Sequence, residues 1–477
     1  MKKILSALLI LSIIFTNFTA NAQKIGYDFP HKNLLSQAMY VKESNSNSVV
    51  FYENAQEKLS ISYLTMIMTS IVAIESFPDI DSTYIEYTLE MRDVYRNTLA
   101  PDIKLVVGDK LSIHDHLYMM MLPSNVRSAT AIAFYYDSLQ SYDSSLGEKD
   151  ENNVDIRATY DVDSPFVKKM NETAIRIGCK NTYFTNPSGL YHAENYSTAE
   201  DVAIMIEYAM NLPYFSDIFA SSSYISSATS SKENGYKIFH TNPLFSKVDY
   251  DGRYYNEYVI GGKTGRNSVA GTSIACVSSD GDYEYITVAL NAPTKDDFGN
   301  LLDSHGSASD TTRLVYWCFS SISKHAVYEK GALISDVKLK YAWGKNSVQL
   351  VASENVVALL PDDILSSHLS IDVNIPDEIE APVKRDDIIA QANIYYDDTF
   401  IGKVDLVAKE SIGKSYLLFL LDIILQPQFI LTTLVVIIIL IVVLLKTSKK
   451  RKANSRIKRR KKKSLQKGTN IKGRNTR

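Results

Sequence analysis

Residues 54–70 read NAQEKLSISYLTMIMTS and change from a polar first half to an apolar second half. The apolar character begins at Thr65 and continues to Glu75, in a run of residues that is compatible with a helix. Tyr63 and Met66 stand at the junction between the two halves. We therefore expect an apolar helix over residues 65–75.

Helical and strand-like patterns alternate on both sides of this stretch, from Gln23 to about Lys324. Apolar residues recur at helical spacing in segments 116–121, 129–136, 167–177 and 199–210. Short β-branched segments, typical of strands, follow at 258–260, 272–277 and 285–290. This order predicts a mixed α/β (α+β) domain, residues 23–325, in which helices pack on a mostly antiparallel sheet.

After about Ala326 the helical signal disappears. Short strand-like segments separated by Gly, Pro, Asp and Asn stand at 337–341, 348–351, 356–360, 369–373 and 388–396. We therefore expect a small all-β domain over residues 326–410.

The first 22 residues are typical of a secretory signal peptide. Lys2 and Lys3 form the positive start, residues 4–18 the apolar stretch, and residues 20–22 a small-x-small cleavage site. The sequence therefore predicts export of the chain after cleavage.

Residues 428–446 are strongly apolar and, at ~1.5 Å per residue, long enough to cross a hydrocarbon layer of roughly 30 Å. The basic tail, residues 447–477, indicates the cytoplasmic side. In the juxtamembrane segment, residues 411–427, a second apolar stretch at 416–425 is interpreted as lying near the outer leaflet. We expect a single-pass protein with its bulk outside the membrane.

The charges are unevenly distributed. The chain has 51 Lys and Arg residues and 54 Asp and Glu residues. Residues 446–477 contain 16 basic residues and no acidic ones, which leaves 35 basic residues against all 54 acidic ones in the rest of the chain. A basic tail beside a membrane span is typical of contact with anionic lipids, so we expect no nucleic-acid partner.

Three cysteines, Cys179, Cys276 and Cys318, are too few and too scattered for a disulfide framework or a metal site. Cys276 and Cys318 stand among apolar residues, which favours buried thiols. His114 and His116 are two residues apart and do not share a helix face, so their segment is interpreted as a polar helix start. No metal and no cofactor is expected.

Three further strings carry recognisable patterns. Residues 166–203 include FVKKMN, FTNPSGL and YSTAEDVA, residues 122–129 read LPSNVRSA, and residues 261–265 read GGKTG. Together with residues 54–70, they resemble the penicillin-binding D-alanyl-D-alanine carboxypeptidases. In that family the corresponding segments carry Ser-x-x-Lys, Ser-x-Asn and Lys-Thr-Gly. The resemblance implies a penicillin-binding/β-lactamase-like transpeptidase domain.

The catalytic positions of that family are altered in this chain. Tyr63 stands at the serine position and Met66 at the lysine position, while Ser124 is kept and Val126 replaces the asparagine. A phenol reaches further than a serine hydroxyl, and a methionine cannot accept a proton. When the catalytic residues of a hydrolase act as one unit, removal of one of them lowers the turnover of the enzyme on the order of 10⁴- to 10⁶-fold. We therefore expect little catalysis through these positions.

The third string is intact. Lys263, Thr264 and Gly265 match Lys-Thr-Gly, and the resemblance implies a strand whose cation and hydroxyl reach toward the terminal carboxylate of the substrate. A retained strand without a ligand is the alternative. Ser62 is a candidate substitute nucleophile, but the residue three positions further on is Thr65 rather than a lysine.

Two functions follow from these observations. The first is a non-catalytic protein of the bacterial cell envelope that binds peptidoglycan stem peptides ending in D-Ala-D-Ala, or envelope proteins. The alternative is a working D-alanyl-D-alanine carboxypeptidase that trims pentapeptides with a substitute nucleophile. A third, weaker possibility is that the basic tail is a cytoplasmic docking segment and the exterior a sensor.

Overall fold

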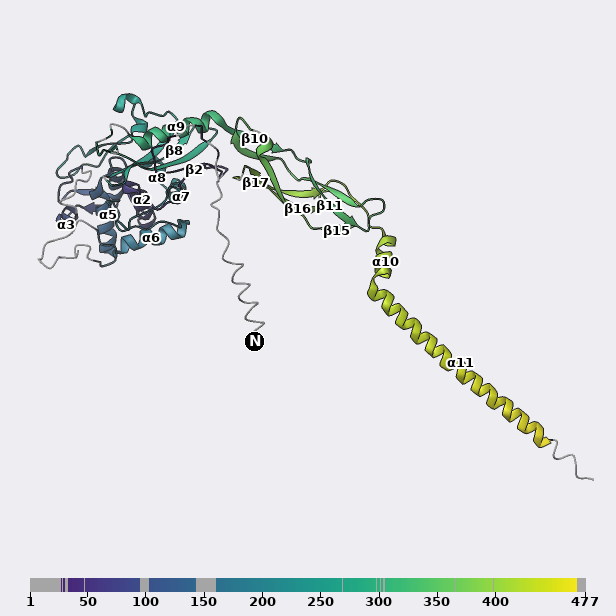
Figure 1. Cartoon of the computed structure of the whole chain (residues 1–477). Coiled ribbons are helices and arrows are strands. Elements are labelled where there is room, and N and C mark those ends of the chain that lie inside the picture. Colours follow the sequence, from purple (N-terminus) through teal and green to yellow (C-terminus); the bar gives the residue numbers. More distant parts are fainter. Residues whose placement is uncertain are drawn as a thin grey trace, which may run out of the picture. The chain divides into compact units, whose positions relative to one another are not determined.

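The computed structural model describes residues 27, 29–30, 33–46, 48–94, 103–142, 160–267, 269–296, 298–300, 302, 305–364, 366–397 and 399–469 (Figure 1). The predicted signal peptide lies outside these residues. The chain divides into two compact units. The first comprises Met1–Val327, Val357–Ile371 and Ile394–Gly402, and the second Tyr328–Val356, Asp372–Asn393 and Lys403–Arg477.

A five-stranded antiparallel sheet forms the centre of the first unit. Its strand order is β2-β1-β9-β8-β7, so the N-terminal pair β1–β2 joins the three later strands through the contact of β1 with β9. The strands are β1 (Ala38–Glu43), β2 (Val49–Glu53), β7 (Val259–Asn267), β8 (Gly271–Ser279) and β9 (Glu284–Ala292). The predicted α/β class and antiparallel sheet are confirmed, and β7 lies at the edge of the sheet.

Helices pack around α2 (Thr65–Ser76), whose residues from Thr65 to Ile74 are all buried. Such an all-round apolar helix is stable only in the interior of a domain. The other helices are α3 (Leu89–Asp93), α4 (Ile113–Met121), α5 (Val126–Leu139), α6 (Pro165–Ile177), α7 (Ala199–Met210), α8 (Phe215–Ala220) and α9 (Gly306–Ser321). α2 contacts α4, α5, α6 and α7, which places the start of α2 inside the helical layer.

Short elements complete this unit. They are the strand pairs β3 (Tyr84–Glu86) with β4 (Lys110–Ser112) and β5 (Ser223–Ile225) with β6 (Lys237–Phe239), and the 3₁₀ helices η1 (Ser62–Leu64), η2 (Pro243–Phe245) and η3 (Asp249–Gly252). η1 runs directly into α2, whose bounds agree with the apolar helix predicted over residues 65–75.

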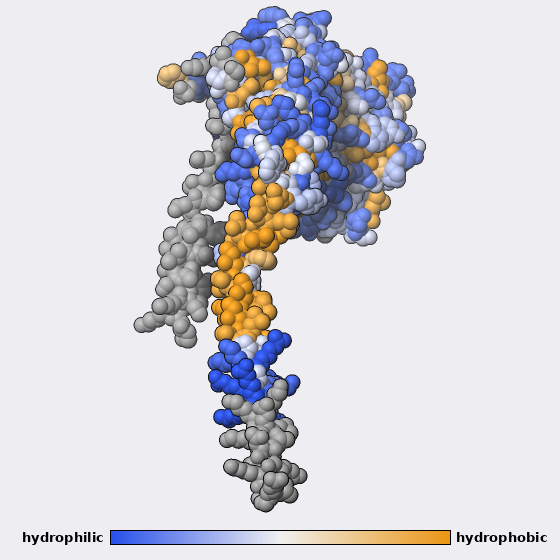
Figure 2. Space-filling model, turned by 90° about the vertical axis from the view of Figure 1, so that its right-hand side faces the viewer, coloured by the Kyte–Doolittle hydropathy of each residue, from blue (hydrophilic) through white to orange (hydrophobic). Residues whose placement is uncertain are grey.

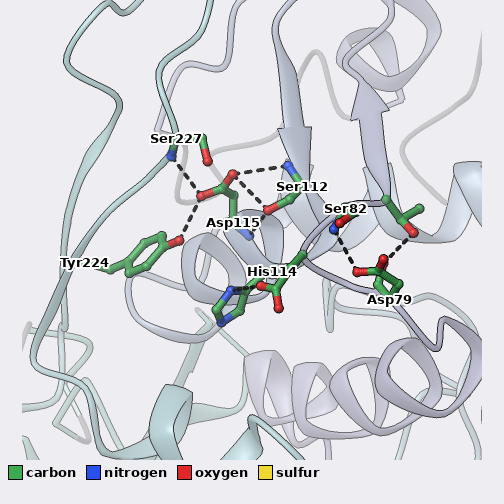
Figure 3. A network of polar contacts seen from close by, with 9 residues as sticks. Asp79, Ser82, Ser112, His114, Asp115, Tyr224 and Ser227 are labelled. Carbon is green, nitrogen blue, oxygen red and sulfur yellow. Dashed lines mark hydrogen bonds and ion pairs between the residues drawn. The ribbon is translucent and has the colours of Figure 1, made fainter.

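The segment with the two close histidines is a polar helix start, as predicted. Ser112 and Asp115 form a capping box at the beginning of α4. The Asp115 carboxylate also accepts hydrogen bonds from the Tyr224 hydroxyl (2.9 Å) and the Ser227 backbone N–H (3.0 Å), so it joins α4 to the β5 region (Figure 3). The neighbouring His114 has a separate partner, because its Nδ1 lies 2.7 Å from the Asp81 carboxylate.

All three cysteines are buried and unbridged, and the burial of Cys276 and Cys318 was expected from their apolar neighbours. Burial raises the pKa of the Cys179 and Cys276 thiols to about 12 and that of Cys318 still further. Thiolate formation is what makes a cysteine reactive, so these thiols pack as small apolar groups.

The C-terminal β region contains a six-stranded sheet of order β14-β16-β17-β12-β11-β15 and a β10-β13 pair. Its strands are β10 (Ile322–Tyr328), β11 (Leu333–Lys340), β12 (Ser347–Ala352), β13 (Val356–Pro361), β14 (Leu369–Asn374), β15 (Glu378–Glu380), β16 (Ile388–Tyr396) and β17 (Thr399–Ala408), with the 3₁₀ helix η4 at Ser366–His368. The all-β class predicted for this region is confirmed.

Two helices follow, α10 (Tyr416–Leu425) and α11 (Pro427–Thr469). Among the described residues, the stretch Pro427–Lys461 is the one helix long and apolar enough to cross a membrane, judged by length and composition. Figure 2 shows one continuous apolar band over α10 and the beginning of α11, followed by hydrophilic residues. The helix continues from the predicted span well into the basic tail.

Candidate functional site

The candidate site centres on Lys263, in the edge strand β7. The side chain is fully buried, and its ammonium donates hydrogen bonds to the Ser124 hydroxyl and to the Thr264 carbonyl, the second at 2.8 Å. The Ser124 contact joins two strings that are 139 residues apart in the sequence. The structure thus brings together Ser124 and the Lys-Thr-Gly strand.

Burial lowers the pKa of Lys263 to about 7. A buried ammonium without an opposite charge is disfavoured because the low-polarity interior cannot replace its hydration. Within the described part of the chain, Lys263 forms no ion pair within 4 Å. The group is therefore poised between its neutral and charged forms near pH 7, and an incoming anion would favour the charged form.

Ser124 occupies an unusual backbone conformation, with φ of +61° in a tight turn before α5. Asn125 follows it and does not replace the missing asparagine of the family pattern. Its side-chain oxygen caps α5 by accepting from the Ser128 backbone N–H (2.9 Å) and hydroxyl (3.0 Å). The Asn125 side chain is thus used to start a helix.

The side chains of the next two residues, Val126 and Arg127, also have structural roles. Val126 is the first residue of α5 and is buried in the core. Arg127 donates to the Tyr87 hydroxyl (3.1 Å) and to the Arg92 carbonyl (2.7 Å), which directs the guanidinium toward α3. Neither side chain supplies the amide group that the family pattern would place beside the substrate.

Tyr63 and Met66 lie where the chain enters α2. Tyr63 is 8% exposed, and burial raises the pKa of its phenol. Met66 is fully buried and belongs to the main hydrophobic core. At the positions of nucleophile and base, the structure therefore has a largely enclosed neutral phenol and a thioether that packs.

Two glycines hold the backbone just before Tyr63. Gly189 has φ of +75°, and a Cβ atom there would lie 2.0 Å from the Ser62 carbonyl oxygen. A Cβ atom on Gly265 would lie 3.0 Å from the Ile61 carbonyl oxygen. The first approach is possible only for glycine, and at Gly265 a side chain would require its neighbour to shift by a few tenths of an ångström. The turn of FTNPSGL, the first string and the Lys-Thr-Gly strand therefore meet around Ser62.

Ser62 does not acquire the partners of a nucleophile. It is 1% exposed with φ of +49°, and its hydroxyl has no hydrogen-bond partner among the described residues. Thr65, three residues on, contacts the Asn195 amide at 3.4 Å. Lys58 lies over the Tyr196 ring, 4.8 Å from its centroid. No base is within hydrogen-bond reach of Ser62 in the part of the chain that is described.

Two site residues, His240 and Thr241, were missed in the sequence. His240 bonds through Nε2 to the Gly262 carbonyl (2.8 Å), while its Nδ1 accepts from the Asn242 backbone N–H (2.8 Å). The Thr241 hydroxyl lies 3.3 Å from the Thr264 hydroxyl. The Asn-Pro pair in HTNPL, residues 240–244, marks a turn and was the available signal.

His240 is held in its neutral form. Burial lowers its pKa to about 3, and the neighbouring Lys263 charge acts in the same direction. With Nδ1 accepting and Nε2 donating, the ring keeps one proton and fixes the backbone of β7 beside Lys263. His240 thus positions the strand and adds no charge to the site.

Comparison with protein families supports the class of fold. Residues 162–294 match the family described as D-alanyl-D-alanine carboxypeptidase, and residues 323–414 match the C-terminal domain of penicillin-binding protein 5. The first match begins after Tyr63, Met66 and Ser124, so the altered strings lie before the matched segment. The second coincides with most of the β region.

Curated relatives extend over more of the chain. D-alanyl-D-alanine carboxypeptidase DacF of Bacillus subtilis is 24% identical over 422 residues, which are 87% of this chain and 96% of the relative. D-alanyl-D-alanine carboxypeptidase DacA of Haemophilus influenzae is 26% identical over 259 residues, or 52% of this chain and 58% of the relative. The chain therefore spans nearly all of one relative and just over half of the other.

Solved structures show the same architecture. Penicillin-binding protein 5 from Haemophilus influenzae aligns with a TM-score of 0.53 and 20% identity, covering 81% of this chain and all of its own. The DacD carboxypeptidase from Francisella tularensis aligns with a TM-score of 0.57 and 17% identity, covering 83% and 99%. The fold is that of the penicillin-binding proteins. Within this class, the chain belongs to the D-alanyl-D-alanine carboxypeptidase family.

Proposed function

We propose that this chain is a membrane-anchored relative of the D-Ala-D-Ala carboxypeptidases that binds cell-wall stem peptides, or envelope partners, without hydrolysing them. The observation that carries the proposal is the contrast within one site. Tyr63 and Met66 are packed side chains without acid–base capacity, whereas Lys263 keeps a buried ammonium bonded to Ser124. A site in this state retains charge for binding and lacks a nucleophile–base pair at the family positions.

The chemistry of the Lys263 region fits a carboxylate. Thr241 is exposed and Thr264, the neighbour of the buried lysine in β7, is half-exposed, and their hydroxyls lie 3.3 Å apart. Hydroxyl donors beside an unpaired ammonium suit an anion with two oxygens. We infer that the terminal carboxylate of a D-Ala-D-Ala peptide binds to these two threonines and is held by the Lys263 charge.

The location follows from the C-terminal helix. The apolar part of α11 is long enough to span a bilayer, and the basic residues after it favour the cytoplasm. We infer that the two folded units lie outside the bacterial cell membrane, where peptidoglycan is found. The predicted signal peptide agrees with this orientation.

Binding is tested by calorimetric titration of the chain with a peptide ending in D-Ala-D-Ala. We expect saturable binding without release of D-alanine. Replacing the lysine by an uncharged side chain of similar length, Lys263→Met, should weaken binding at least ~30-fold, as expected when a charge-assisted contact of roughly 2 kcal/mol is lost. Affinity should also fall as the pH rises above about 7, because Lys263 then loses its proton.

The matched control is Lys237→Ala, an exposed lysine on β6, which should leave the affinity unchanged. The same peptide with an amidated C-terminus should bind to the native chain as weakly as the free acid binds to Lys263→Met. Undiminished binding of the amidated peptide, or undiminished binding by Lys263→Met, would contradict the carboxylate site.

One contact favours the alternative of residual catalysis. The Ser124 hydroxyl is bonded to a lysine with a pKa of about 7, which is the arrangement of a nucleophile and its base. In such a reaction neutral Lys263 would take the hydroxyl proton while Ser124 Oγ bonds to the penultimate D-Ala carbonyl carbon. The C–N bond to the terminal D-Ala would break, that amine would receive the proton, and water would later hydrolyse the ester.

A labelled penicillin separates the two functions. We expect no covalent labelling of the native chain, because Ser124 is only 4% exposed. Labelling that disappears in Ser124→Ala and persists in the control Ser62→Ala would establish the Ser124–Lys263 pair as catalytic. Loss of labelling in Ser62→Ala alone would instead identify Ser62, which precedes the family's serine position, as the nucleophile.

A further inference from the structure

The turn between β11 and β12 exposes the largest apolar side chain of the second unit. Trp343 is 72% exposed, within a turn that includes Tyr341 at φ +58° and Gly344 at φ +74°. The protein has only two tryptophans, and the other, Trp317, is 7% exposed. An exposed tryptophan in an ordered turn has no packing role inside its own domain.

The same turn contacts α10 through a hydrogen bond and aromatic packing. The Tyr341 hydroxyl donates to the Asp422 carboxylate (2.7 Å), and the Tyr341 ring meets the Phe419 ring at 5.2 Å. The Lys414 ammonium lies over both rings, 5.2 Å from the first centroid and 3.9 Å from the second. The Tyr341 carbonyl also accepts from the Ser415 backbone N–H at 2.6 Å, just before α10 begins. Turn and helix therefore form one contact region.

The opposite face of α10 is apolar and uncovered. It presents Leu417, Leu420, Leu421 and Ile424, spaced by three and four residues and between 43% and 57% exposed. A single residue separates the end of α10 from the first residue of α11. If α11 spans the bilayer, α10 must lie at its surface, since one residue extends the chain by at most about 3.6 Å.

The lysines around the turn are already paired. Lys345 forms an ion pair with Glu410, and Lys414 lies 3.7 Å from Glu380. The region therefore carries little unbalanced positive charge, and contact with a membrane would rest on apolar burial. Aromatic and lysine side chains together are typical of the membrane–water interface.

We propose that the β11–β12 turn is a membrane-contact site, with Trp343 seated in the lipid headgroup region beside α10. This rests on the proposed function, because α11 must first anchor the chain. The consequence is that the second unit meets the bilayer through a folded turn as well as through its helices. The occupant of this surface is lipid, and salt should have little influence on the contact.

The test uses the full chain reconstituted into vesicles of phosphatidylcholine and phosphatidylglycerol in equal parts, with or without bromine on the acyl chains. Trp317→Phe leaves Trp343 as the single fluorophore, and bromine quenches tryptophans that touch the lipid. We expect its fluorescence to fall in brominated vesicles relative to vesicles without bromine, because tryptophan at the membrane–water interface lies within reach of the lipid. The variant Trp343→Phe leaves Trp317 as the single fluorophore, and its fluorescence should not fall in brominated vesicles.

A third variant supplies the matched control. Trp317→Phe with Trp343→Phe and Leu333→Trp moves the fluorophore to the other end of β11, about 23 Å away at ~3.3 Å per residue. We expect no quenching there. Absence of quenching at Trp343, or equal quenching at both ends of β11, would overturn the proposal.

Flotation of the same vesicles distinguishes a failure of the α11 anchor from a failure of the turn contact. A chain that does not float with lipid lacks the proposed α11 anchor. A chain that floats but shows unquenched Trp343 keeps its anchor and lacks the turn contact.

Discussion

Restoring the family residues, Tyr63→Ser with Met66→Lys, is expected to create covalent labelling by a penicillin in a chain that otherwise shows none. Met66 is fully buried at the first turn of α2, so a lysine there would have a lowered pKa and could act as a base. The smaller side chain at position 63 would remove the phenol ring from the start of that helix. The nucleophile and base would then be one helical turn apart, as the family pattern requires.

The expected gain in the rate of acylation is at least ~10³-fold over the native chain, a fraction of what such paired residues contribute in serine hydrolases. It is measured by gel fluorescence of labelled penicillin over time. Adding Val126→Asn should raise the rate further by returning an amide to the second string.

The control for this experiment is Tyr63→Ser with Met66→Leu, which has the hydroxyl without the base and should stay unlabelled. Circular dichroism establishes that each variant is folded. A folded variant that carries all three restoring substitutions and still stays unlabelled would show that the backbone around α2 no longer has the geometry for acylation. That result would contradict the proposal that the side chains at positions 63 and 66 prevent acylation.

The second large effect is a loss of stability in mild acid, caused by His116. The imidazole is fully buried in α4, and neither ring nitrogen has a hydrogen-bond partner among the described residues. Burial lowers its pKa from the ordinary 6.5 to about 4. Between these values the unfolded chain binds a proton that the folded chain does not, so the free energy of unfolding falls as the pH falls.

The difference amounts to roughly 3 kcal/mol by pH 4, at 1.36 kcal/mol for each unit of pKa difference. Urea titrations at pH 7, 6, 5 and 4 measure it. His116→Met should make the profile less steep over this window, because an uncharged side chain of similar size titrates nowhere in it. His240, also neutral in the folded chain, adds a loss in the same direction that remains in this variant.

Leu117→Met is the matched control, since it changes the next buried residue of the same helix without touching a titratable group. Its stability should shift by a similar amount at every pH. A His116→Met profile as steep as that of the native chain would show that the acid sensitivity comes from other groups.

Elements with a strong local signal were predictable. The helices at 65–76 and 199–210 and the strands at 271–279 and 284–292 have regular apolar patterns, and they were expected close to their observed bounds. The strand expected at 258–260 extends to Asn267, because the polar segment GGKTGRN continues the ladder with β8 without an apolar pattern of its own. α9 was missed because its first half, GSASDTTR, is polar and small. Its buried Asp310 accepts hydrogen bonds from the backbone of Leu35 and Ser36, a contact across some 275 residues that periodicity cannot reveal.

The candidate site was predictable where it depends on residue identity. Ser124 and Lys263 were named from their strings, and the structure brings them together. Thr241 and His240 were missed because their role depends on packing beside β7, without a distinctive pattern of their own. The burial of Lys263 could not be predicted either, since it results from the assembly of the sheet and helices around it.

The closest contacts of Gly189 and Gly265 with the Ser62 region are made to carbonyl oxygens of the backbone. Carbonyl groups are the same whatever side chain follows, so these two glycine contacts do not depend on which residue occupies position 63. A lineage can therefore exchange its nucleophile by point substitution while the surrounding architecture stays intact. Evolution of a binding protein from an enzyme would need no intermediate with a damaged fold.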